Sequence, residues 1–210
     1  MTTDPAPDAS AAAAAPMPDD PDLAGTLAFL REAGRLKDTL RSAHTGGGRQ
    51  ESTAEHSWRL ALWVLALGER LPEGIDADRL LRILLVHDLG EALGGDVPAP
   101  LQHSEPDRAA RERRDLEALV APLPEGPREA ILGLAREYDE ATTPEGRLAR
   151  GLDKLETILQ HVQGDNPPGF DHAFNLGYGR DRTDAQPLTR ALREPLDRET
   201  RRLAGTGDAG

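Results

Sequence analysis

The stretch Leu84-Leu-Val-His-Asp-Leu-Gly-Glu91 places two ionisable side chains, His87 and Asp88, within a run that is otherwise apolar. Burying such a pair costs several kcal/mol unless the two groups are hydrogen-bonded or bind a metal ion. If one helix continues through the run, Glu91 lies one turn beyond both residues, and the three side chains converge on one point. The pair by itself is compatible with a satisfied core hydrogen bond or with a metal site, and the rest of the chain has to distinguish the two.

Other ionisable residues also interrupt apolar stretches. His56 stands at the start of an apolar helical run, Asp153 lies among leucines at helical spacing, and Asp96 directly follows Gly94-Gly95. Two imidazoles and two carboxylates suit Mn²⁺, Co²⁺, Fe²⁺, Ni²⁺ or Mg²⁺ rather than a soft ion. Four protein ligands leave about two positions of an octahedron for water and substrate, which is typical of a catalytic site. We therefore predict one divalent metal ion bound by His56, His87, Asp88 and Asp153.

The hydrophobic pattern predicts an all-α fold. No sustained alternation of β-branched residues is present, and apolar residues recur at helical spacing in about six or seven segments. Ser52 or Thr53 is expected to cap the second helix, and the run Leu60–Leu67 is apolar on nearly all sides, which predicts a helix at the centre of the core. The expected helices cover residues 21–40, 53–67, 78–89 (with an end near Gly94-Gly95), 105–121, 125–138, 144–163 and 188–203.

The chain is expected to form a single domain with short tails. Residues 1–20 are rich in Ala, Pro and Asp without apolar periodicity, which predicts a disordered N-terminal tail. The domain is expected to span residues 21–204, and residues 205–210 are expected to be a flexible C-terminus. A length of 210 residues is within the range of one domain with a real core.

Composition and charge exclude several classes of function. The net charge of −12 is spread along the chain, whereas nucleic-acid binding needs clustered Lys and Arg, so no nucleic-acid partner is expected. The absence of cysteine excludes disulfides and thiolate metal sites. The apolar runs are too short to span a bilayer and the first residues lack a signal-peptide pattern, so no membrane partner and a cytoplasmic location are expected.

The same residues, in the same order, resemble the H…HD…D signature of the HD-domain phosphohydrolase superfamily. The nearer similarity is to the branch of bacterial 5′-deoxynucleotidases and their eukaryotic relatives, the proteins similar to HD-domain-containing protein 2. The similar stretches lie within residues 36–163 and are Leu36-Lys37, Arg41, Glu51–Trp58, Val86–Glu91, Gly95-Asp96 and Leu152–Leu155.

This resemblance implies a single HD-domain helical bundle and a role for each matching residue. Glu91 is expected to position or deprotonate the attacking water, Asp96 to contact the substrate and assist the leaving group, and Arg41 to bind the phosphate. A metal ion and an arginine suit this task because a phosphate monoester dianion repels hydroxide. The expected reaction is hydrolysis of a small phosphorylated substrate, a nucleoside 5′-monophosphate, to nucleoside and phosphate. Because related enzymes are often dimers, a homodimer is also expected.

The sequence departs from the family pattern and leaves alternatives open. Ser42 stands where the bacterial deoxynucleotidases have a Trp that helps to enclose the nucleotide. A metal-dependent oxygenase or lyase of the same fold is a second hypothesis, although dinuclear oxygenases carry several histidines where this chain has only His103. A binding module with a structural metal is a third. Arg49 and Lys154 are expected at the solvated surface, with positive charge near the phosphate as the alternative. The aromatic residues in 166–178 are expected either to pack on the core or to stack on a ligand.

Overall fold

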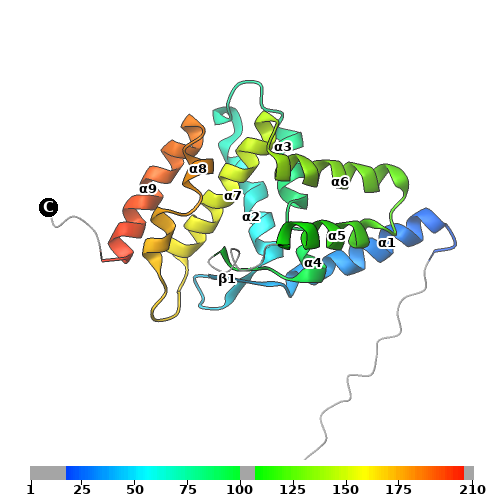
Figure 1. Ribbon diagram of the computed structural model, residues 1–210, viewed down its shortest axis with the longest axis horizontal. Helices are drawn as coiled ribbons and strands as arrows, with labels where there is room; N and C mark the ends of the chain where they lie inside the picture. Colours follow the sequence, from blue (N-terminus) through cyan, green and yellow to red (C-terminus); the bar gives the residue numbers. More distant parts are fainter. Residues whose placement is uncertain (1–17, 100–106, 206–210) are drawn as a thin grey trace, which may run out of the picture.

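Helix α7 (Pro144–Gln163) runs through the middle of the molecule, and the other helices are arranged around it (Figure 1). The computed structural model describes residues 18–99 and 107–205. On one side of α7 lie α1 (Pro21–Ala33), α5 (Arg108–Val120) and α6 (Glu125–Glu140), and on the other lie α8 (Arg180–Thr183) and α9 (Pro187–Leu203) (Figure 1). The remaining elements are α2 (Thr53–Leu67), α3 (Ala77–Val86), α4 (Glu91–Gly94), β1 (Leu40–His44) and β2 (Gln50–Ser52).

The all-α fold is as the sequence predicts. Seven helices in the described part of the chain are ten residues or longer: α1, α2, α3, α5, α6, α7 and α9. Short polar side chains determine where several begin, because they accept hydrogen bonds from free backbone N–H groups of the first turn. Ser52 and Glu55 form a reciprocal capping box on α2, and Thr143 caps α7 with Pro144 as its first residue.

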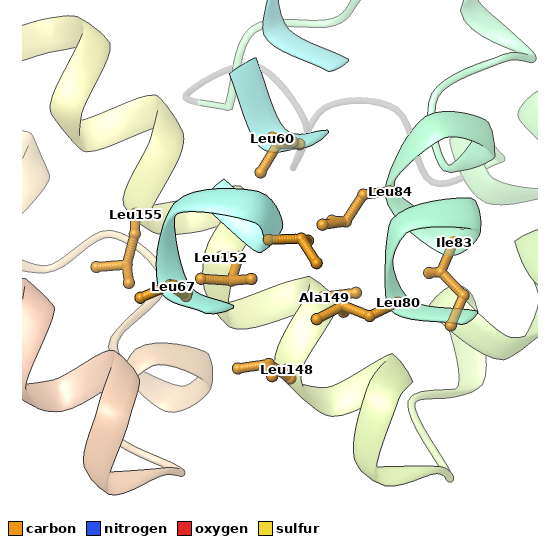
Figure 2. Close-up of a cluster of buried hydrophobic side chains, with 10 residues drawn as sticks. Leu60, Leu67, Leu80, Ile83, Leu84, Leu148, Ala149, Leu152 and Leu155 are labelled. Carbon is orange, nitrogen blue, oxygen red and sulfur yellow. The ribbon is translucent and has the colours of Figure 1, made fainter. Parts of the chain in front are cut away.

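The core lies where α2, α3 and α7 meet. Its fully or almost fully buried side chains come from all three helices (Figure 2): Leu60, Val64 and Leu67 on α2, Leu80, Ile83 and Leu84 on α3, and Leu148, Ala149, Leu152 and Leu155 on α7. Complete burial of one such leucine contributes roughly 1.5–3 kcal/mol. These three helices are therefore fixed relative to one another, and side chains at their ends are held with them.

Helix α2 is less enclosed than its sequence predicts. Leu60, Val64 and Leu67 are buried, but Trp58 is 62% exposed and Leu65 is 69% exposed. The apolar character of this helix therefore extends onto a face that the chain itself does not cover.

The first expected helix, over residues 21–40, is too long. Helix α1 ends at Ala33, a single 3₁₀ turn follows at Gly34–Lys37, and the chain then enters β1. Strands β1 and β2 form an antiparallel hairpin with Leu40 opposite Ser52 and an irregularity in the pairing. Strands of five and three residues are too short to show an alternating pattern, which is why the sequence did not predict them.

The helix expected over residues 78–89 also ends early. Helix α3 stops at Val86, residues 87–90 form a turn, and Glu91 begins the separate four-residue helix α4. The prediction that Glu91 lies on the same helix as His87 and Asp88 is therefore wrong.

Most of the predicted tails and the residue His103 lie outside the described residues, as does the start of the helix expected at residue 105. Residues 164–187, expected to be a loop, contain a 3₁₀ segment at His172–Leu176 and the short helix α8. In the part of the chain that the structure describes, no helix combines the length and the apolar character that a membrane crossing requires.

Candidate metal centre and active site

The four predicted metal ligands lie at one place although they come from three separate parts of the chain. His56 is in the first turn of α2, His87 and Asp88 follow the end of α3, and Asp153 lies midway along α7. His56 Nε2 is 3.2 Å from Asp153 Oδ1, and His87 Nε2 is 3.0 Å from Asp88 Oδ2. The crossed distances are 3.8 Å from His56 Nε2 to Asp88 Oδ2 and 4.0 Å from His87 Nε2 to Asp153 Oδ1.

Both histidines present the same nitrogen to this point. Nδ1 of His87 donates to the backbone carbonyl of Leu84 at 2.8 Å, and Nδ1 of His56 donates to the carboxylate of Glu156. The Nε2 atoms of both rings are buried and make no hydrogen bond in the described part of the protein. A buried polar atom without a partner is costly, so two such nitrogens facing two carboxylates fit a bound cation.

Asp153 is held with one oxygen free to face the two histidines. The Tyr138 hydroxyl donates to Oδ2 at 2.6 Å, and Lys154 Nζ is 2.8 Å from the same oxygen. Burial alone would raise the pKa of Asp153, but the Lys154 ammonium and the two imidazoles hold this pKa well below its usual range. Lys154, expected at the surface, has a side chain that is only 22% exposed and lies over the Tyr178 ring.

Arg41 reaches the same point from the hairpin that the sequence did not predict. Its Nη1 is 3.7 Å from Asp88 Oδ2, and its Nη2 donates to the Thr157 hydroxyl at 3.1 Å. The Nε atom is 3.4 Å from Glu51 Oε2. Burial would lower the pKa of the guanidinium, but Asp88, Glu156, Asp96 and Asp153 outweigh it and raise this pKa, so Arg41 stays charged.

Glu91 and Asp96 lie beside the four residues. Glu91 is 7% exposed, and its Oε2 accepts a hydrogen bond from the Thr53 hydroxyl at 3.0 Å. Burial, together with the negative charges of Asp88 and Asp96, raises the pKa of Glu91 to about 9. Asp96 is half-buried after α4, and burial raises its pKa against the attraction of Arg41. The two carboxyl groups and Arg41 therefore act on one another electrostatically.

A cavity of about 300 Å³ opens beside these residues. His87, Asp88 and Glu91 are among its lining residues, and α5 and α6 contribute Glu112, Arg113, Arg136 and Asp139. This cavity gives a small ligand access to His87, Asp88 and Glu91.

The sequence did not single out Glu51 and Glu156, which form a second acidic group around His56. Both are buried, at 3% and 0% exposed. These two carboxylates and His56 lie close enough together to hold a cation. Arginines already pair with them, however: Arg41 with Glu51, and Arg59 Nη2 with Glu156 at 2.5 Å. The guanidinium charges favour the site formed by His56, His87, Asp88 and Asp153 over this second one.

One signal for Glu156 was present in the sequence. Glu156 stands between Leu155 and Ile158 on a helix whose inward face is apolar. It therefore interrupts an apolar pattern in the same way as His56 and Asp153. Glu51 carried no such signal, because its burial depends on the hairpin.

Residues 166–178 pack locally. The Phe170 ring contacts His161 with centroids 4.9 Å apart, and the Phe174 and Tyr178 ring centroids are 5.4 Å apart. These ring contacts favour the interpretation that the aromatic residues pack within the protein over the interpretation that they stack on a ligand.

Comparisons with known proteins show the family to which the chain belongs. The sequence profile of the family described as HD domain matches residues 33–193. The chain is 29% identical over 151 residues to the 5′-deoxynucleotidase HDDC2 of Mus musculus, covering 70% of this chain and 74% of the relative. It is 31% identical over 156 residues to the 5′-deoxynucleotidase hdd1 of Schizosaccharomyces pombe, covering 70% and 73%.

A solved structure is also similar over most of the chain. It is the protein of Magnetospirillum magnetotacticum MS-1 described as a predicted metal-dependent phosphohydrolase. The TM-score is 0.74 at 29% identity, with 88% of this chain and 98% of that chain covered.

Proposed function

This chain belongs to the HD domain family and is a metal-dependent phosphohydrolase, and on that premise we propose that its substrate is a nucleoside 5′-monophosphate. The names of the relatives support the substrate class, since those of Mus musculus and Schizosaccharomyces pombe are called 5′-deoxynucleotidases. The products are a nucleoside and inorganic phosphate. Whether the sugar is ribose or deoxyribose is part of the test below.

We propose that His56, His87, Asp88 and Asp153 hold one divalent cation. The two imidazole nitrogens and two carboxylate oxygens are the donor set of a borderline or hard divalent ion, such as Mn²⁺, Co²⁺, Fe²⁺, Ni²⁺ or Mg²⁺. When bound, the cation supplies positive charge that offsets the charge of the phosphate and makes a nearby water more acidic. The single observation that carries this proposal is the pair of buried, unpartnered Nε2 atoms facing Asp88 and Asp153.

The residues beside the cation have separate tasks in the proposal. Arg41 binds the non-bridging phosphate oxygens, because its guanidinium remains charged and presents two parallel donors. Glu91 orients the attacking water and accepts its proton in the ionised form, which the charge of a bound cation would favour against the burial that raises its pKa. Asp96 lies near the leaving group and donates the proton that the departing alkoxide needs.

The test is a phosphate-release screen of ribo- and deoxynucleoside 5′-monophosphates, run in parallel with Mn²⁺, Co²⁺, Ni²⁺, Fe²⁺ and Mg²⁺. We expect metal-dependent release with at least one deoxynucleotide. Glu91→Gln is expected to retain metal binding and to lose kcat by about 100-fold or more. Asp153→Asn is expected to lose metal binding itself.

Three outcomes would contradict the proposal. Full activity in Glu91→Gln would remove the proposed base. Metal binding without turnover on any nucleotide would indicate a binding module. Two equivalents of iron per chain with consumption of O₂ would indicate the oxygenase hypothesis.

A further inference from the structure

The ring of His56 is held by a buried carboxylate rather than by the backbone. Its Nδ1 donates to Oε2 of Glu156, and both side chains are completely buried. The corresponding atom of His87 donates to the carbonyl of Leu84, which is part of its own helix. One imidazole is therefore oriented by local helix geometry, and the other by a residue 100 positions away in the sequence.

Glu156 is itself fixed at its other oxygen. Arg59 Nε donates to Oε1 at 2.6 Å, and Arg59 Nη1 donates to Gln163 Oε1 at 3.2 Å. Arg59 lies one turn beyond His56 on α2, whereas Glu156 and Gln163 belong to α7. This set of contacts joins the two helices next to the proposed metal centre and gives Glu156 a donor on each oxygen.

We propose that Glu156 is a positioning residue of the metal centre: it keeps the proton of His56 on Nδ1 and aims Nε2 at the cation. The proposal rests on the metal centre proposed above. A neutral imidazole has one protonated nitrogen and one that can bind a metal, and an acceptor at Nδ1 leaves Nε2 as the binding atom. Asp153 and Glu156 are three residues apart on α7, so one helical turn supplies both a ligand and the group that orients another ligand.

Glu156→Gln tests the contact because an amide cannot replace both carboxylate oxygens. It has one acceptor and one donor group, whereas His56 and Arg59 both present donors. If the amide nitrogen faces His56, the ring proton moves to Nε2 and blocks the metal. If it faces Arg59, the amide oxygen still accepts from His56, but the two donors at Arg59 repel each other and shift the side chain that holds the ring.

We expect Glu156→Gln to bind Zn²⁺ or Mn²⁺ about 10–100-fold more weakly than the wild-type protein, measured by calorimetric titration without substrate. Excess metal is expected to restore part of the activity, because the ligands themselves remain. The matched control is Asp197→Asn, which removes a buried carboxylate on α9 that is paired with Arg193 and Arg180. It is expected to lower stability without changing metal affinity.

A second measurement does not require the variant to fold. Ring ¹⁵N shifts of His56 in the Zn²⁺-loaded wild-type protein are expected to show a protonated Nδ1 and a metal-bound Nε2. The reverse assignment would overturn the proposal, and so would a metal affinity of Glu156→Gln within about threefold of the wild type. If the wild-type protein bound two metal equivalents and Glu156→Gln bound only one, a cation would lie between Glu51, His56 and Glu156. That result would also overturn the proposal. Because substrate is absent from both measurements, failure to hydrolyse nucleotides would not affect them.

Discussion

At the scale of single residues, buried charged side chains outside the proposed metal centre pair with oppositely charged or polar groups of the chain. Glu137 on α6 accepts from Arg79 on α3, with 3.1 Å between Oε1 and Nε, and from Thr143 at 2.5 Å. The completely buried Arg193 donates to Asp197 and to the backbone carbonyl of Asn175. Against this background, the Nε2 atoms of His56 and His87 stand out because they are buried without a hydrogen-bond partner in the described part of the chain, as the proposed cation site requires.

The Glu137 contact predicts a pH-dependent contribution to stability. Burial would raise the pKa of Glu137, but the hydrogen bonds from Arg79 and Thr143 lower it below its ordinary 4.5. The contribution is therefore complete above pH 4.5 and is lost as pH falls through the lower folded-state value. We expect Glu137→Gln to reduce the free energy of unfolding by about 1 kcal/mol at pH 7, since Arg79 is half-exposed, and by less at pH 4.

Urea unfolding of both proteins at the two pH values measures this difference. Glu73→Gln, in an exposed turn before α3, serves as the control and is expected to change stability by less than about 0.5 kcal/mol. If the loss of unfolding free energy caused by Glu137→Gln grew as the pH fell, the contact with Arg79 would not be its source.

Single residues also show how far the site could be anticipated. His56, His87, Asp88 and Asp153 were identifiable because each interrupts an apolar pattern, and the structure brings them together. The prediction that Lys154 lies at the solvated surface was wrong, because nothing in the sequence indicates that Asp153 and Tyr178 contact its ammonium group. Contacts of this kind depend on which helices pack together, and that information is not contained in local spacing.

At the scale of elements, the break between α3 and α4 is the feature that the hydrophobic pattern could not show. Gly90 precedes Glu91, and a methyl group at this glycine would lie 2.6 Å from the backbone carbonyl oxygen of Glu112 on α5. Because Gly90 has no side chain, the turn packs against the backbone of α5 more closely than any other residue at this position would allow. Periodicity records which residues are apolar, and apolar residues at helical spacing stand on both sides of this turn, with Val86 before it and Ala92 after it, so the pattern gives no sign of the break.

This close approach predicts a strong effect of Gly90→Ala. We expect a loss of about 1–3 kcal/mol in the free energy of unfolding, because a backbone carbonyl cannot move aside cheaply. Activity is expected to fall as well, since the same shift moves Glu91. Thermal unfolding and kcat measure the two effects.

Gly133→Ala is the matched control. That glycine lies exposed within α6 and has nothing within 4 Å of an added methyl group. It is expected to stabilise the protein by roughly 0.5–1 kcal/mol with unchanged kcat. Equal effects of the two substitutions would show that the contact with α5 is not the cause.

At the scale of the whole molecule, the proposed metal centre and the hydrophobic core depend on the same three helices. α2, the end of α3 and α7 carry the proposed ligands, and the same helices supply the buried leucines (Figure 2). The expected N-terminal tail and the expected homodimer remain predictions, although the exposed apolar residues Trp58 and Leu65 on α2 are compatible with an intermolecular contact.

A cation bound across three core helices is expected to stabilise the folded chain. A ligand present at 100 times its Kd adds about 2.7 kcal/mol, which corresponds to a rise in Tm of roughly 5–10 °C for a protein of this size. Scanning calorimetry with and without EDTA measures the shift, and Asp153→Asn is expected to show none. An unchanged Tm in the wild-type protein would argue against a cation at this place.

Because α7 belongs to both the leucine core and the ligand set, scarcity of the metal has a consequence beyond slower catalysis. Chains without the cation open more often, and proteases degrade a protein in proportion to the time it spends open. Metal starvation would therefore reduce the abundance of this enzyme together with its turnover. Its steady-state level would then depend on metal supply without any dedicated sensor.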